Sequence, residues 1–217
     1  MSLQQLIQHG RVWRGRDNGI HQPVDTGLGL ASGHDALDDA LPLGGWPRAA
    51  LTEILHAYSG QGELQLLLPA LSRLSNDERY IVLIDPPWIP YAPALSAAGI
   101  DLRFVISIGA SHSQQTSSLA DCDRDWALEQ SLRASQCGAV LAWPRQELDN
   151  KTLRRLQLAA EAGDSCAFLF RDPRFRNQHS PAALRLQLYP QNHGLQLEII
   201  KCRGRNPSAA RIEISNR

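Results

Sequence analysis

The chain has 217 residues, of which 43% are hydrophobic and 20% are charged, the balance of an ordinary globular domain with a sizeable core. No apolar run reaches the roughly 18–20 residues that cross a bilayer, and no apolar stretch follows a basic N-terminus, so we expect no membrane span, no secretory signal and a cytoplasmic location. The formal net charge is zero, but residues 171–217 carry nine Lys or Arg against three Asp or Glu, an asymmetry that favours either an acidic or nucleic-acid partner or a solvated face.

The four cysteines and seven histidines are scattered along the chain. Cys122, Cys137, Cys166 and Cys202 form no C-x-x-C pair, and no H-E-x-x-H motif is present. The spacing therefore predicts reduced thiols, no metal site and no disulfide framework.

Apolar periodicity predicts an alternating order of strands and helices. Apolar runs predict strands at residues 49–55, 80–84, 104–108, 138–142 and 166–170. Amphipathic spacing predicts helices within residues 1–17 and at 35–41, 61–74, 93–98, 125–135 and 149–162. Two alternating runs, 183–188 and 195–202, then surround a Pro- and Gly-containing turn and predict an antiparallel hairpin.

This order predicts an α/β fold with a doubly wound, mostly parallel sheet that a C-terminal β-hairpin extends at one edge. We divide the chain into an N-terminal helix with a flexible loop (residues 1–32), a core (33–173) and a basic C-terminal hairpin extension (174–217). Ligands of such sheets bind at the carboxyl ends of the strands, so the chemistry is expected just after each strand.

The loop after the first strand reads H-A-Y-S-G-Q-G-E-L from residue 56. It lies between a strand and a Leu-rich helix, as a P-loop does, and a P-loop supplies a Lys for the phosphates and a hydroxyl for Mg²⁺. Here Ser59, Gly60 and Gly62 are followed by Glu63, which repels a triphosphate, and by Leu64, which cannot bind the metal. This degenerate P-loop predicts no nucleotide cofactor and no ATPase activity.

Other positions offer weaker candidates. The Gly-rich residues 27–33 precede the first strand, so they are not a dinucleotide fingerprint. Asp85 ends the second strand, where it could hold a metal or serve as a turn or capping residue. The three residues directly after the strand that ends at Ala142 include no acidic one, and no nucleophile–base pair is present. We therefore expect a binding protein and not an enzyme.

Three blocks of the sequence resemble RecA. They are residues 33–54, with G-H-D-A-L-D-D-A-L and G-G-W-P-R, the pair I-D at 84–85 with A-G-I-D at 98–101, and residues 153–170. The resemblance implies a RecA-like core in which every ATP-handling group has been replaced. The P-loop Lys and Thr fall on Glu63 and Leu64, the catalytic Glu near Pro87, the Walker-B Asp near Trp143 and the switch Gln near Arg171.

Two families of degenerate RecA relatives are similar to this chain. Residues 51–173 resemble both SulA, a cell-division inhibitor, and ImuA, an accessory protein of damage-induced mutagenesis. The ends resemble ImuA: W-R-G-R at 13–16, the block through Trp46 and Pro47, and K-C-R-G-R at 201–205. On these ends the chain is identified as a member of the ImuA family, with the SulA family as the alternative.

The ImuA resemblance implies a non-catalytic accessory role in error-prone translesion DNA synthesis. It implies three partners, namely an ImuB-type polymerase-like protein, a damage-inducible C-family DNA polymerase and RecA, with DNA as a further candidate and no membrane. The SulA alternative implies an SOS inhibitor of cell division that binds FtsZ.

A basic segment at each end of the chain is a candidate contact for DNA or a partner. Near the N-terminus, Trp13 beside Arg14 and Arg16 is typical of an interface anchor, with packing onto its own domain as the alternative.

Near the C-terminus, Lys201, Arg203 and Arg205 alternate along a predicted strand, and a period of two places them on one side. They fit DNA phosphates, an acidic partner surface, or an edge strand whose charges discourage unwanted pairing.

Overall fold

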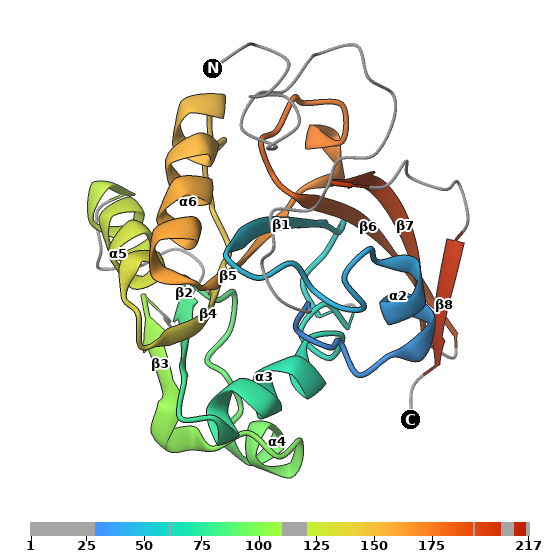
Figure 1. Ribbon diagram of the computed structural model, residues 1–217, viewed down its shortest axis with the longest axis horizontal. Helices are drawn as coiled ribbons and strands as arrows, with labels where there is room; N and C mark the ends of the chain where they lie inside the picture. The colour runs from blue at the N-terminus through green and yellow to red at the C-terminus, as the bar shows by residue number, and fades with distance from the viewer. Residues whose placement is uncertain (1–28, 61, 110–120, 193, 205–210, 216–217) are drawn as a thin grey trace, which may run out of the picture.

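The computed structural model describes residues 29–60, 62–109, 121–192, 194–204 and 211–215 (Figure 1). The helix predicted within residues 1–17 and most of the predicted N-terminal loop therefore lie outside the described residues. The described residues form a single eight-stranded sheet with helices against it.

Strands and helices alternate through residue 171, and three strands follow with no α-helix between them among the described residues. The first set is α2 (Asp35–Ala40), β1 (Ala50–Leu55), α3 (Leu68–Asn76), β2 (Tyr80–Ile84), α4 (Ala92–Ala97), β3 (Val105–Ile108), α5 (Asp121–Arg133), β4 (Cys137–Ala142), α6 (Asn150–Gly163) and β5 (Cys166–Arg171). The second set is β6 (Leu184–Gln191), β7 (Gly194–Cys202) and β8 (Arg211–Ser215), with 3-10 turns η1 (Leu102–Phe104) and η2 (Pro173–Phe175).

The sheet is mixed, with the strand order β3-β2-β4-β5-β1-β6-β7-β8. The first six strands in this order, from β3 to β6, are parallel to one another. Strand β7 is antiparallel to β6, and β8 is antiparallel to β7. The prediction of a RecA-like doubly wound sheet with an added hairpin was wrong. Strand β6 belongs to the parallel part through β1, and an eighth strand that we did not predict closes the antiparallel part.

The error has a physical cause. Parallel neighbours are usually joined by a helix, so the absence of helical periodicity after residue 171 favoured a separate hairpin. Here the connection from β5 to β6 is irregular apart from η2, and the pairing that makes β6 parallel to β1 leaves no local trace in the sequence.

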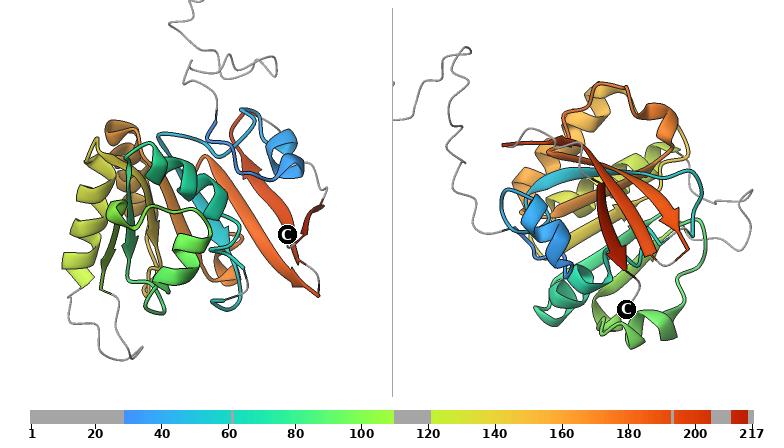
Figure 2. Two further views of the ribbon diagram at one scale, coloured as in Figure 1. Left: turned by 90° about the horizontal axis from the view of Figure 1, so that it is seen from below. Right: turned by 90° about the vertical axis from the view of Figure 1, so that its right-hand side faces the viewer.

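Helices cover both faces of the sheet (Figure 2). Leu37 of α2, Leu71 of α3 and Leu95 of α4 belong to one buried apolar cluster, and Leu132 of α5 and Leu153 of α6 belong to the other. Among the described residues, no helix is both long and apolar enough to cross a membrane.

The helix after β1 starts later than its leucine spacing predicts. Residues 62–67 form turns, and regular helix begins at Leu68. Gly62 has a φ of +95°, which is outside the helical region, and Pro69 stands in the first turn, where its fixed φ and missing N–H are tolerated.

A fully buried carboxylate on β1 links three strands. Glu53 accepts a hydrogen bond at Oε1 from Arg171 Nη1 (3.2 Å) on β5, and another at Oε2 from Arg185 Nε (2.9 Å) on β6. Ser180 Oγ also donates to Oε1 (2.6 Å). A buried charge needs such partners, because removing one of them leaves the remaining charged groups buried without a counter-charge and out of reach of water.

The same cluster holds the irregular connection in place. Arg185 donates to the backbone oxygens of Phe175 (2.8 Å), Arg176 (3.0 Å) and Gln178 (3.0 Å). Since a helix would have satisfied these carbonyls internally, the arginine replaces the missing helix as their hydrogen-bond donor.

Two cysteines occupy neighbouring strands at the centre of the sheet. Cys137 begins β4 and Cys166 begins β5, and both are buried. Burial raises the pKa of the Cys137 thiol to about 11 and that of the Cys166 thiol to about 12.

We expect Glu53→Gln to lower the free energy of unfolding by about 3–5 kcal/mol, because two buried guanidiniums lose their counter-charge. The matched control is Glu213→Gln on β8, an exposed position where the change should stay within about 0.5 kcal/mol. Urea denaturation of both variants measures this difference, and equal stability of the two would contradict the structural role of Glu53.

Candidate partner-binding surface

The loop that follows β1 is closed by its own carboxylate. Glu63 is buried, and its Oε1 accepts a hydrogen bond from the backbone N–H of Gly60 (2.7 Å). Its Oε2 is also buried and has no hydrogen-bond partner among the described residues. A negative side chain thus occupies the place where backbone N–H groups of such a loop would meet a phosphate.

The same loop presents an aromatic residue. His56 is buried, and its Nδ1 lies 2.9 Å from the backbone oxygen of Tyr58. Because a carbonyl oxygen only accepts, this contact places the imidazole proton on Nδ1. The turn leaves the Tyr58 side chain 74% exposed.

The loop that follows β2 is fixed by an ion cluster. Asp85 is buried with a φ of +52°, a conformation that Asp tolerates better than most residues. Its carboxylate accepts hydrogen bonds from Arg145 Nε (2.6 Å) and Nη2 (3.1 Å), and Arg124 Nε lies 3.6 Å away. Of the two roles considered for Asp85, the geometry matches an anchor for its loop. Within the described ranges no group of His, Cys, Asp or Glu side chains could hold a metal ion.

The two loops border one cavity of about 320 Å³ at the carboxyl ends of the strands. The floor includes Trp143 and Phe170, whose rings stack 4.5 Å apart at 16°. The walls include Ala57 and Ser59 from the loop after β1, and Pro86 and Pro87 from the loop after β2. A volume this small suits one or two side chains of a partner better than a large cofactor.

Exposed aromatic and apolar side chains stand beside this cavity, and we name them the aromatic rim: Tyr58, Trp88, Ile89 and Tyr91. Trp88 is 61% exposed and Tyr91 71% exposed, and Trp88 directly follows the wall residue Pro87. Large exposed apolar side chains near a cavity are typical of interaction sites, and Trp and Tyr dominate binding energy at interfaces.

Sequence reasoning missed the aromatic rim. The signal was available in the run P-P-W-I-P-Y from residue 86, where large apolar residues follow a buried strand in a segment that proline keeps from being helical.

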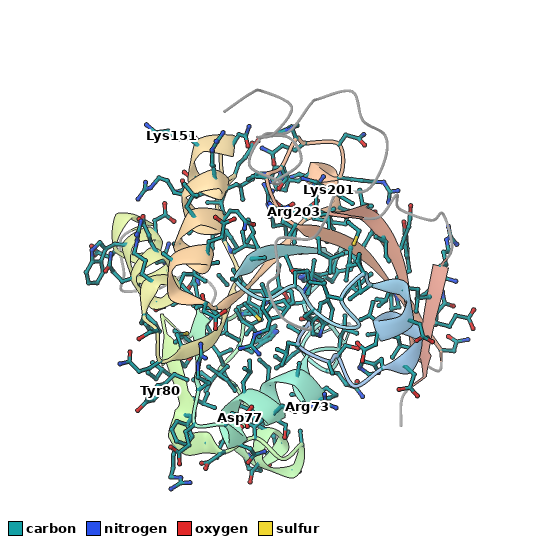
Figure 3. All side chains as sticks on the ribbon, viewed as in Figure 1. Arg73, Asp77, Tyr80, Lys151, Lys201 and Arg203 are labelled. Atoms are coloured by element: carbon teal, nitrogen blue, oxygen red, sulfur yellow. The ribbon has the colours of Figure 1, made fainter. Side chains whose placement is uncertain are left out.

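The predicted C-terminal contacts lie elsewhere, as Figure 3 shows for Lys201 and Arg203. Lys201 is half-buried near the end of β7, and its Nζ donates to the backbone oxygen of Ser180 (2.7 Å). Arg203 is exposed in the turn after β7, so the strand ends before the predicted three-residue alternation is complete. Arg205, like Trp13, Arg14 and Arg16, lies outside the described residues.

The sequence is similar to one family along more than half of its length. The profile of the family described as "Cell division inhibitor SulA" matches residues 50–167. The chain is 27% identical over 145 residues to the cell division inhibitor SulA of Cronobacter sakazakii, covering 64% of this chain and 80% of that protein. It is 22% identical over 163 residues to the SulA of Yersinia enterocolitica, with coverage of 75% and 79%.

A solved structure is also similar. The crystal structure of SulA from Pseudomonas aeruginosa aligns with a TM-score of 0.43 at 23% sequence identity, covering 58% of this chain and 98% of that chain.

We expect the purified protein not to be stabilised by Mg-ATP, because the Glu63 carboxylate opposes the phosphates. A ligand at one hundred times its Kd would raise the free energy of unfolding by about 2.7 kcal/mol, which thermal melting detects readily. The matched variant is Glu63→Ala. A melting shift with ATP in the native protein that the variant loses would contradict this prediction.

Proposed function

We propose that this chain, which belongs to the SulA family of cell division inhibitors, arrests division after DNA damage by binding the division GTPase FtsZ. The aromatic rim is the observation that carries this proposal, because it offers a large exposed apolar surface without catalytic groups. The proposal places the interaction in the cytoplasm and involves no cofactor and no chemical step.

The identification with the ImuA family was wrong. The family profile covers residues 50–167, whereas the ImuA interpretation depended on short motifs near both ends. The predicted role in translesion synthesis was therefore wrong. The same holds for the partners that the ImuA resemblance implied, namely ImuB, the C-family polymerase, RecA and DNA. The prediction that the chain is not an enzyme is confirmed, since the family to which it belongs consists of inhibitors.

The geometry supports binding through the rim in two ways. Both loops are held from inside, one by Glu63 on Gly60 and the other by Arg145 on Asp85, so the aromatic side chains are presented on ordered backbone. Preorganised loops lose less entropy on association, which leaves more of the contact energy for affinity.

The adjoining cavity adds a place for an anchor. A side chain from the partner that enters the cavity would pack against the stacked rings of Trp143 and Phe170. Interfaces are strongest where an apolar anchor fills a pocket and surrounding contacts exclude water.

We expect Trp88→Ala to weaken binding to FtsZ by about tenfold or more, because truncating a central aromatic at an interface typically costs at least about 1.4–2 kcal/mol. Overproduction of this variant should no longer cause cells to filament. Its melting temperature should stay close to that of the native protein, since the indole is largely exposed.

The matched control is Trp126→Ala on α5, where the indole is 66% exposed but lies far from the rim in sequence and on a different element. The control should retain both FtsZ binding and filamentation. Native-like binding by the Trp88 variant, or equal loss in both variants, would remove the rim from the proposal.

A further inference from the structure

The buried carboxylate of Glu53 has more cationic neighbours than it can neutralise. Arg171 and Arg185 both contact it, and all three side chains are buried. Burial has the largest effect and lowers the pKa of Arg171; Arg185 lowers it further, whereas Glu53 and, more weakly, Glu147 raise it. By charge count, the two guanidiniums and Glu53 carry one excess positive charge, with Glu147 as a weaker negative neighbour of Arg171.

Two further cationic side chains, Lys201 and Arg203, extend the excess positive charge from the interior to the surface. Lys201 Nζ donates to the backbone oxygen of Ser180, the residue whose hydroxyl donates to Glu53. Burial lowers the pKa of Lys201, and Arg203 and Arg185 lower it further. Arg203 is exposed one residue beyond β7. Within the described part of the chain, neither Lys201 nor Arg203 has a carboxylate within salt-bridge distance.

Outside the described ranges the sequence has more basic than acidic residues: Arg11, Arg14, Arg16, Arg205 and Arg217 against Asp17 and Asp25. An excess of charge that is partly removed from water is costly, so a counter-charge from another molecule would be bound favourably.

We infer that Lys201 and Arg203 form a docking site for an acidic segment of a partner protein, whose carboxylates neutralise the excess charge of the Glu53 cluster. Lys201 Nζ contacts the backbone oxygen of Ser180, and the backbone N–H of Arg203 donates to Ala183 O (2.7 Å), so both cations lie where the end of β7 pairs with the start of β6. A nucleic-acid backbone is bound instead by cations spread along its track. The gathered arrangement favours one or two carboxylate side chains.

Lys201 and Arg203 are not among the residues that line the cavity beside the aromatic rim, although Arg171 of the Glu53 cluster is. Strand β6 runs parallel to β1, and its first residue, Leu184, pairs with Thr52 near the start of β1. The rim stands at the opposite, carboxyl end of β1 and β2. The inference therefore goes beyond the proposed function and does not require FtsZ to be the acidic partner.

The test uses a fluorescein-labelled oligoglutamate peptide and fluorescence anisotropy with the full chain at about 50 and 300 mM salt. The variant is Lys201→Met with Arg203→Gln, which removes both charges and retains most of the side-chain volume. The control is Arg73→Gln with Arg103→Gln, which removes the same charge from exposed positions on α3 (Arg73 in Figure 3) and on η1 before β3, the strand at the far edge of the sheet from β7.

We expect the native chain and the control to bind the peptide with affinities within about twofold of each other, and the site variant to bind about tenfold or more weakly. Binding should weaken at the higher salt concentration, because exposed charges are screened. The site variant should melt at or above the native temperature, since its lysine charge is disfavoured by burial and by neighbouring cations.

Three outcomes would overturn the inference: no peptide binding by the native chain at low salt, an equal loss in the control, or tighter binding of a single-stranded oligonucleotide through the same two residues. The last result would assign the site to nucleic acid. Because the assay contains no FtsZ, its failure leaves the proposal for the aromatic rim untouched.

Discussion

The structure depends on the hydrogen bonds and counter-charges that one buried carboxylate, that of Glu53, receives inside the sheet. Glu53 lies on β1, the strand where the parallel part reaches β6, and it binds an arginine from each neighbouring strand. Arg185 supplies three of the hydrogen bonds that hold the helix-free connection after β5 against the sheet, and Glu53 fixes that arginine in place. The polar cluster thus attaches residues 172–183 to the sheet, as the packing of apolar helix faces attaches the other connections.

Internal polar contacts also decide what the carboxyl edge of the sheet can do. Each ionisable group there contacts the protein itself: Glu63 accepts from the backbone N–H of Gly60 in its own loop, and Asp85 accepts from Arg145 in the loop after β4. Groups that in other α/β proteins face a ligand are turned inward, and aromatic side chains face outward instead. Exposed apolar surface of this kind is typical of sites that bind another protein.

The sequence predicts elements better than it predicts their pairing. Strand β2 spans the five residues expected from its continuous apolar run, and α6 lies within one residue of its expected bounds. Strand β8 was missed because R-I-E-I-S is short and follows a long gap, and its apolar side becomes meaningful only once β7 is beside it. The aromatic rim was missed for a related reason, since exposure depends on how two distant loops come together. The wrong family followed from weighing end motifs above the longer core similarity.

The thiols of Cys137 and Cys166 can report on the opening of the centre of the sheet. At neutral pH their raised pKa values leave almost no thiolate, and buried sulfur cannot meet a reagent. Alkylation at these two positions must therefore wait until β4 and β5 separate from their neighbours. The rate of modification in the native protein consequently measures the free energy of that opening, without any introduced probe.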